Sequence, residues 1–150
     1  MTSRVVSCTA TVVMSVVWLA AVAVSVAWVS GLVSADGSIA DPDYLWRPLS
    51  ISDGTRLGLG LAATMVMLGH GWLLFRSNMN GNMTRLRRAV LIPAAAVAAY
   101  GGLTYSAATA PTIGANIGGA LMLLGAAPFF AAMVIVAGVM IRRGRSTSPT

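Results

Sequence analysis

The sequence contains no lysine, glutamate or glutamine, and charged residues make up only 9% of its 150 residues. An average soluble domain has about 25% charged residues. The chain therefore has too few charges to cover a water-exposed surface, and a soluble globular protein is excluded. Its basic residues are all arginine and its acidic residues all aspartate, a bias that suits GC-rich coding.

Several chemically useful arrangements are also missing. Cys8 is the single cysteine, so neither an internal disulfide nor a cysteine zinc site can form. The sequence shows no nucleophile–base pair, no glycine-rich phosphate loop and no paired carboxylates. Each arginine cluster adjoins an apolar segment, unlike the basic faces of nucleic-acid binders. We expect a protein that is not an enzyme and that binds no metal and no nucleic acid.

Long apolar runs dominate the sequence, and 57% of its residues are hydrophobic. A helix needs about 20 mainly apolar residues to cross a membrane, whereas barrel strands alternate apolar and polar residues. The runs predict an all-α membrane protein: four transmembrane helices in an antiparallel bundle, forming one integral membrane domain over residues 1–150. The predicted spans are about residues 5–33, 57–75, 89–108 and 113–141.

The remaining segments are predicted connections. Residues 34–56 form an external loop, and residues 76–88 form a flexible, polar cytoplasmic loop rich in asparagine. A tight hairpin around Pro111 makes the third and fourth helices neighbours. Residues 146–150 are small and polar, and we expect them to be disordered.

The first span shares features with a signal peptide. Arg4 precedes it, and Val33-Ser34-Ala35 is similar to a cleavage site. However, the apolar core of a signal peptide is about 7–15 residues long, and this run continues unbroken to Val33. We expect a retained membrane anchor, with cleavage as the alternative.

Arginine counts predict the orientation, because cytoplasmic loops are enriched in basic residues. One side of the membrane has eight arginines, namely Arg4, Arg76, Arg85, Arg87, Arg88, Arg142, Arg143 and Arg145. The other side has Arg47 and Arg56 with all four aspartates, so the two sides carry +8 and −2, which sum to the net +6. We predict that both termini are cytoplasmic. The arginines from Arg76 to Arg143 are the predicted anchors to anionic lipids and determinants of topology.

The external loop contains a small polar and aromatic cluster of Asp41, Asp43, Tyr44 and Trp46. Amphipathic aromatic side chains settle at the headgroup level of a membrane, so we expect the loop to lie along the outer surface. The alternative is a docking surface for a partner outside the cytoplasm. The spacing of a calcium-binding loop is missing.

In size and layout the chain resembles the small multidrug resistance transporters, which have about four helices in little more than a hundred residues. That family carries a membrane-embedded glutamate in its first helix. Here the segment from Val12 to Trp28 has only serine as a polar group. The resemblance is therefore one of size, and proton-coupled antiport is not expected.

His70 is the single histidine of the sequence, and it is position 14 of the 19 in the second predicted span. We expect a neutral side chain that is hydrogen-bonded to a neighbouring helix. The alternatives are a proton-handling role and a haem ligand, paired with Met65, with Met67 or with His70 of a second copy.

Two rows of small residues predict close helix packing. Ala23, Ala27 and Gly31 are spaced by four in the first span, as are Gly114 and Gly118 in the fourth. Ala115 and Gly119 lie one position around from Gly114 and Gly118, and Asn116 is a candidate hydrogen-bonding side chain between them. We expect these rows to pack the first and fourth helices directly together. Contact with other subunits is the alternative.

These features predict an accessory or interaction subunit of a larger complex in the inner membrane of a bacterium. The missing chemistry, the packing surfaces and the small soluble parts all favour that role. One alternative is a small homo-oligomeric pore or transporter, including a holin-like protein. Another is a haem-binding helper that uses His70.

The predicted orientation can be tested with reporter fusions. A phosphatase fused at Thr150 should be inactive and a fluorescent protein there should fluoresce, because both termini are predicted to be cytoplasmic. A phosphatase inserted at Gly37 should be active. An active phosphatase at Thr150 would overturn the orientation.

Overall fold

The structure is a computed structural model that describes the backbone of residues 2–33, 45–47, 49–110 and 113–145. Side chains are described for residues 10–31, 45–47, 49–110 and 117–143. Most of the predicted external loop and the predicted tail at 146–150 lie outside the described residues.

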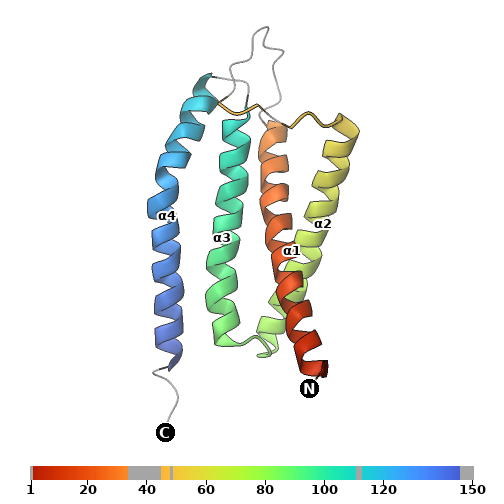
Figure 1. The fold of residues 1–150 in the computed structure, drawn as a ribbon, viewed down its shortest axis with the longest axis vertical. Helices are drawn as coiled ribbons and strands as arrows, with labels where there is room; N and C mark the ends of the chain where they lie inside the picture. Colours follow the sequence, from red (N-terminus) through yellow and green to blue (C-terminus); the bar gives the residue numbers. More distant parts are fainter. Residues whose placement is uncertain (1, 34–44, 48, 111–112, 146–150) are drawn as a thin grey trace.

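The described chain contains four α-helices and each is long and apolar enough to cross a membrane. They are α1 (Thr2–Val33), α2 (Asp53–Met79), α3 (Arg85–Ala108) and α4 (Ile113–Arg145), as Figure 1 shows. The prediction of an all-helical protein with four candidate membrane spans is confirmed.

Each helix is longer than the apolar span predicted within it. The hydroxyl of Ser52 caps α2 by accepting a hydrogen bond from the Thr55 N–H at 3.2 Å. The hydroxyl of Thr84 caps α3 by accepting from the Arg87 N–H at 3.2 Å. Such caps satisfy N–H groups that have no partner in the first turn of a helix. Helical bonding thus continues into polar flanks, and residues 53–56 of the predicted external loop begin α2.

A hydrogen-bonded turn closes α2 and leads directly into α3. Gly81 has a φ of 71°, a left-handed conformation that costs glycine little. The Asn82 N–H donates to the Ser77 carbonyl at 3.0 Å, and the Gly81 N–H donates to the Asn78 carbonyl at 3.1 Å. This pair of bonds is a Schellman cap. The loop predicted as flexible over residues 76–88 is therefore a short ordered turn between two longer helices.

The helices lie in an open row in the order α2, α1, α3, α4 (Figure 1). Among the described residues, α1 packs against both α2 and α3, whereas α4 packs against α3 alone. In the same residues, α2 contacts neither α3 nor α4. The start of α1 and the end of α4 lie at the same end of the bundle along the helix axes, at the bottom in Figure 1. Each edge helix of the row is therefore covered on one side only.

The α1–α2 interface is built around two tryptophans of α1. The indole N–H of Trp18 donates to the carbonyl oxygen of Met67 at 3.1 Å. The indole of Trp28 lies over Gly60, where a methyl group would overlap the ring. Residue numbers rise along α1 as they fall along α2, so these two pairs also set the register of the interface.

The α1–α3 interface depends on a close backbone approach at Gly102. A methyl group added there would overlap the carbonyl oxygen of Ala23 and lie 3.1 Å from the backbone nitrogen of Ala27. Further along, the corresponding position on Gly31 lies 4.0 Å from the hydroxyl oxygen of Ser106. Small residues allow membrane helices to approach in this way and to gain van der Waals contact. The predicted small-residue row of α1 therefore faces α3.

The predicted direct packing of the first and fourth helices is wrong, because α3 lies between them in the described residues. On α4 the close contact is at Gly119, where a methyl group would lie 3.0 Å from Cα of Ala108 in α3. At Gly118 no atom lies within 4 Å of such a methyl group. The physical reason is that α3 carries small residues on two faces, with Gly102 toward α1 and Ala108 toward α4.

Replacing Gly102 with alanine should destabilise the protein, because the new methyl group would overlap the backbone of α1. We expect a loss of about 1–3 kcal/mol, the usual cost of overpacking, measured as unfolding by a denaturing detergent. Gly101→Ala is the matched control, since no atom lies within 4 Å of the added methyl group. Equal stability of the two variants would contradict the close contact.

Candidate functional site

Several of the described hydroxyl groups inside the helices bond to the backbone of their own helix. Ser15, Thr64 and Thr104 each donate to the carbonyl oxygen four residues earlier, at 2.8–2.9 Å. Such bonds satisfy a hydroxyl without a partner helix. Within the part of the chain that the structure describes, no group of three histidine, cysteine, aspartate or glutamate residues could hold a metal ion. The described helices thus present few polar atoms to a substrate.

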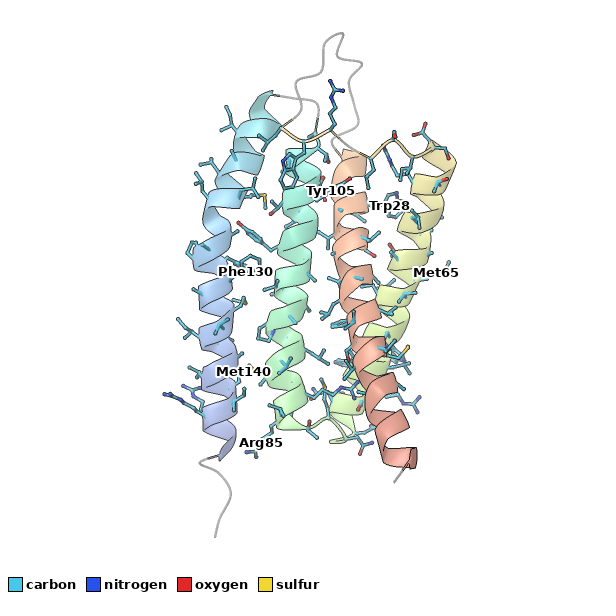
Figure 2. The ribbon with its side chains drawn as sticks, in the orientation of Figure 1. Trp28, Met65, Arg85, Tyr105, Phe130 and Met140 are labelled. Atoms are coloured by element: carbon cyan, nitrogen blue, oxygen red, sulfur yellow. The ribbon has the colours of Figure 1, made fainter. Side chains whose placement is uncertain are left out.

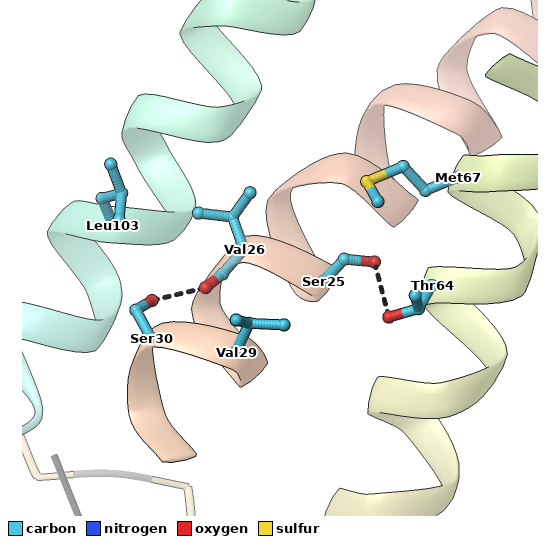
Figure 3. Close-up of a pocket in the computed structure, with 7 residues that line it drawn as sticks. All are labelled: Ser25, Val26, Val29, Ser30, Thr64, Met67 and Leu103. Atoms are coloured by element: carbon cyan, nitrogen blue, oxygen red, sulfur yellow. Dashed lines mark hydrogen bonds between the residues drawn. The ribbon is translucent and has the colours of Figure 1, made fainter. Parts of the chain in front are cut away.

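A groove of about 280 Å³ runs along α1 between α2 and α3 (Figure 3). Its lining residues are Ser25, Val26, Val29 and Ser30 of α1, Thr64 and Met67 of α2, and Leu103 of α3. The hydroxyl groups of the groove already form hydrogen bonds within the protein. Ser30 donates to the Val26 carbonyl, and the hydroxyls of Thr64 and Ser25 form a hydrogen bond with 3.4 Å between their oxygen atoms. Small-molecule sites are usually about 300–1,000 Å³ with convergent polar groups. The groove is a small, mainly apolar depression without such groups.

His70 lies in α2 beside Trp18 of α1, with 6.2 Å between the ring centroids. Both ring nitrogens are buried and neither has a hydrogen-bond partner. The expected hydrogen bond to a neighbouring helix is therefore not formed. Met65 is 73% exposed and does not share the burial of His70.

The predicted anchoring arginines lie at the end of the molecule where α2 and α4 end and α3 begins. Figure 2 labels one of them, Arg85. They differ in burial. Arg76, Arg85, Arg142 and Arg143 are exposed, whereas Arg87 and Arg88 are half-buried. The Nε atoms of Arg87 and Arg88 are buried and have no hydrogen-bond partner. The sequence alone does not separate these two arginines from the others.

The structure places only part of the predicted external docking cluster. Asp41, Asp43 and Tyr44 lie outside the described residues. Trp46 is 53% exposed, and its backbone N–H donates to the carbonyl oxygen of Ala108 at the end of α3, at 2.9 Å. This bond satisfies one of the last carbonyl groups of that helix and attaches the chain before α2 to α3.

The predicted packing residues of α4 are only partly placed. The side chain of Asn116 and the surroundings of Gly114 lie outside the described side chains. Gly118 has no atom within 4 Å of an added methyl group and so makes no close helix contact.

One interhelical contact was missed from the sequence. The hydroxyl of Tyr100 in α3 donates to the carbonyl oxygen of Met122 in α4 at 2.5 Å. The Tyr100 ring also stacks on Phe129, with centroids 4.4 Å apart and planes at 14°. A tyrosine inside an apolar span was the available signal, because a buried tyrosine hydroxyl usually has a partner.

The chain matches no known protein family, no curated protein and no solved structure.

Replacing His70 with phenylalanine tests whether this residue binds a ligand. The substitution removes two unpartnered nitrogens and keeps a flat ring, so we expect unfolding stability to be unchanged or raised by about 1 kcal/mol. The purified wild-type protein should show no Soret band. A Soret band that disappears in His70→Phe would instead establish the haem alternative.

Proposed function

We propose that the protein is a non-enzymatic accessory or interaction subunit of a larger membrane complex. The observation that carries this proposal is the open row of helices, in which α2 and α4 each have a single neighbour among the described residues. A row that does not close leaves two long apolar helix faces for contact with other membrane helices. The few accessible polar atoms in the described spans favour a packing role over a catalytic one.

The proposed location is the inner membrane of a GC-rich bacterium, with the helices crossing in alternate directions and both termini in the cytoplasm. Two features support this arrangement. Six described arginines, Arg76, Arg85, Arg87, Arg88, Arg142 and Arg143, lie at one end of the helices, whereas Asp53 and Arg56 lie at the opposite end of α2 from Arg76. In the sequence all four aspartates precede Gly54, in the connection to α2 or at its start. A basic side next to anionic lipids is typical of the cytoplasmic face.

The two edge helices offer different surfaces to a partner. The outer face of α2 combines bulky side chains such as Trp72, which is 63% exposed, with Gly58, where an added methyl group meets no atom within 4 Å. The outer face of α4 has Leu124, 76% exposed, and Gly138, which also has open space around it. Glycines between large apolar residues allow a partner helix to approach closely.

Enlarging one exposed glycine at a time would test the edges. The variants are Gly58→Leu on α2 and Gly138→Leu on α4, with Gly101→Leu on the central helix α3 as the control. All three positions have open space for the first added carbon, so the fold should tolerate each change. If a partner helix packs on an edge, the added side chain should hold that helix away. We expect at least one edge variant, but not the control, to lose its partner during purification in a gentle detergent.

Mass spectrometry of the purified material separates this role from the alternatives. Wild-type protein that carries a defined set of other membrane proteins, depleted by an edge variant, supports the subunit. A homo-oligomer without other proteins would contradict it and favour a pore. Partners retained by all three glycine variants would exclude both edges as the docking surface.

A further inference from the structure

In the described structure, the buried side-chain nitrogen and oxygen atoms that lack a hydrogen-bond partner belong to three side chains. They are both ring nitrogens of His70 and the Nε atoms of Arg87 and Arg88. Buried N–H groups in proteins nearly always have an acceptor, and an unpaired one calls for an explanation such as a bound water or ion. Arg87 and Arg88 are neighbours in the sequence, so one anionic acceptor can serve both.

Arg87 and Arg88 flank the face of α3 that packs on α1. Leu91 is about three helical turns before Gly102 and so lies on the same face, and it is only 6% exposed. Arg87 and Arg88 lie about one helical turn before Leu91. Because successive residues of a helix are about 100° apart, their side chains lie on either side of that face. From α2, His70 is close enough to Arg87 for an electrostatic interaction. The cluster formed by Arg87, Arg88 and His70 therefore borders the α1–α3 interface at the start of α3.

No carboxylate in the described residues can neutralise this cluster. Asp53 is the acidic residue among them, and it begins α2, about 25 Å along the helix from His70 at 1.5 Å per residue. Half-buried guanidinium groups without a counter-charge are unfavourable. An anionic ligand would therefore stabilise Arg87 and Arg88 together.

The depth of the cluster indicates where such an anion comes from. Arg76 ends the apolar part of α2, and just before it the exposed rings of Trp72 and Phe75 stack, with centroids 5.9 Å apart. Aromatic side chains of this kind settle at the level of lipid headgroups. The phosphate groups of the bilayer are therefore the anions nearest to Arg87 and Arg88.

We infer that Arg87 and Arg88 form a specific site for the phosphate group of an anionic membrane lipid. Guanidinium groups bind phosphate oxygens through two parallel N–H donors, and Nε is one of the donors that can take part. In this site the phosphate oxygens replace the atoms that now cover Nε. The exposed side chains of Arg142 and Arg143 in α4 are not among those with a buried, unpartnered Nε atom, and they are not part of the site.

Substitution by lysine distinguishes a specific phosphate-binding site from nonspecific electrostatic attraction of anionic lipids. Arg87→Lys with Arg88→Lys keeps the charge that sets topology but removes the fork of donors. Arg142→Lys with Arg143→Lys is the matched control, with the same change on exposed residues at the same end. Binding of a short-chain phosphatidylglycerol to the purified full chain in neutral detergent would be measured by native mass spectrometry. Phosphatidylcholine and inorganic phosphate are the comparison ligands.

Wild-type protein and the control should bind one phosphatidylglycerol tightly, with phosphatidylcholine weaker. The Arg87/Arg88 double variant should bind it about tenfold more weakly, as expected for losing a charged hydrogen bond. Equal binding by both double variants, or no saturable binding by the wild type, would overturn the site. Saturation by inorganic phosphate with the same dependence on Arg87 and Arg88 would overturn the lipid as its occupant. None of these outcomes depends on the proposed subunit role.

Discussion

The close backbone contact between α1 and α3 is the interaction on which the rest of the structure depends. Between helices in a bilayer there is little hydrophobic driving force, so association relies on van der Waals contact and interhelical hydrogen bonds. Gly102 provides the contact by leaving the backbone of α3 against Ala23 and Ala27. Because α2 touches only α1 and α4 touches only α3 among the described residues, this one interface joins the two halves of the row.

The polar side chains are distributed in a way that fits a protein built for contact with apolar surroundings. Within the described helices the hydroxyls of Ser15, Ser30, Thr64 and Thr104 donate to carbonyl oxygens of their own helix. Tyr100 and Trp18 each donate to a carbonyl oxygen of a neighbouring helix. These two bonds lie on either side of the central interface, one to α4 and one to α2. Because hydrogen bonds are directional, they favour one register of each helix pair, which apolar packing alone would not specify.

The number and type of elements followed from the sequence because long apolar runs have few structural solutions in a membrane. Their order in space did not. Glycine and alanine occur on every helix, and an all-apolar helix has no polar face to show which side is buried. Thus Gly102 and Gly101 are equivalent in sequence, yet one lies against α1 and the other has open space around it.

The candidate site was predictable only in part, for a related reason. The sequence predicted all the anchoring arginines from one feature, a positive charge next to an apolar span, and this feature does not distinguish one arginine from another. What distinguishes Arg87 and Arg88 from Arg142 and Arg143 is burial against neighbouring helices, which depends on the order of the row. His70 also lies beside Trp18 of α1, a neighbour that a hydropathy pattern does not reveal. The helix caps at Ser52 and Thr84 could not be predicted from hydropathy either, because capping depends on hydrogen bonds of polar side chains outside the apolar runs.

The order of the row also suits the order in which a ribosome delivers the chain. Domains fold from the N-terminus as they are synthesised, and α1, the first helix, is one of the two central ones. When α2 emerges, α1 is already present to receive it. When α3 emerges, it finds the free side of α1, and α4 then finds the free side of α3. Every helix therefore meets a partner made before it, and no half-built stage needs a helix that has yet to be translated.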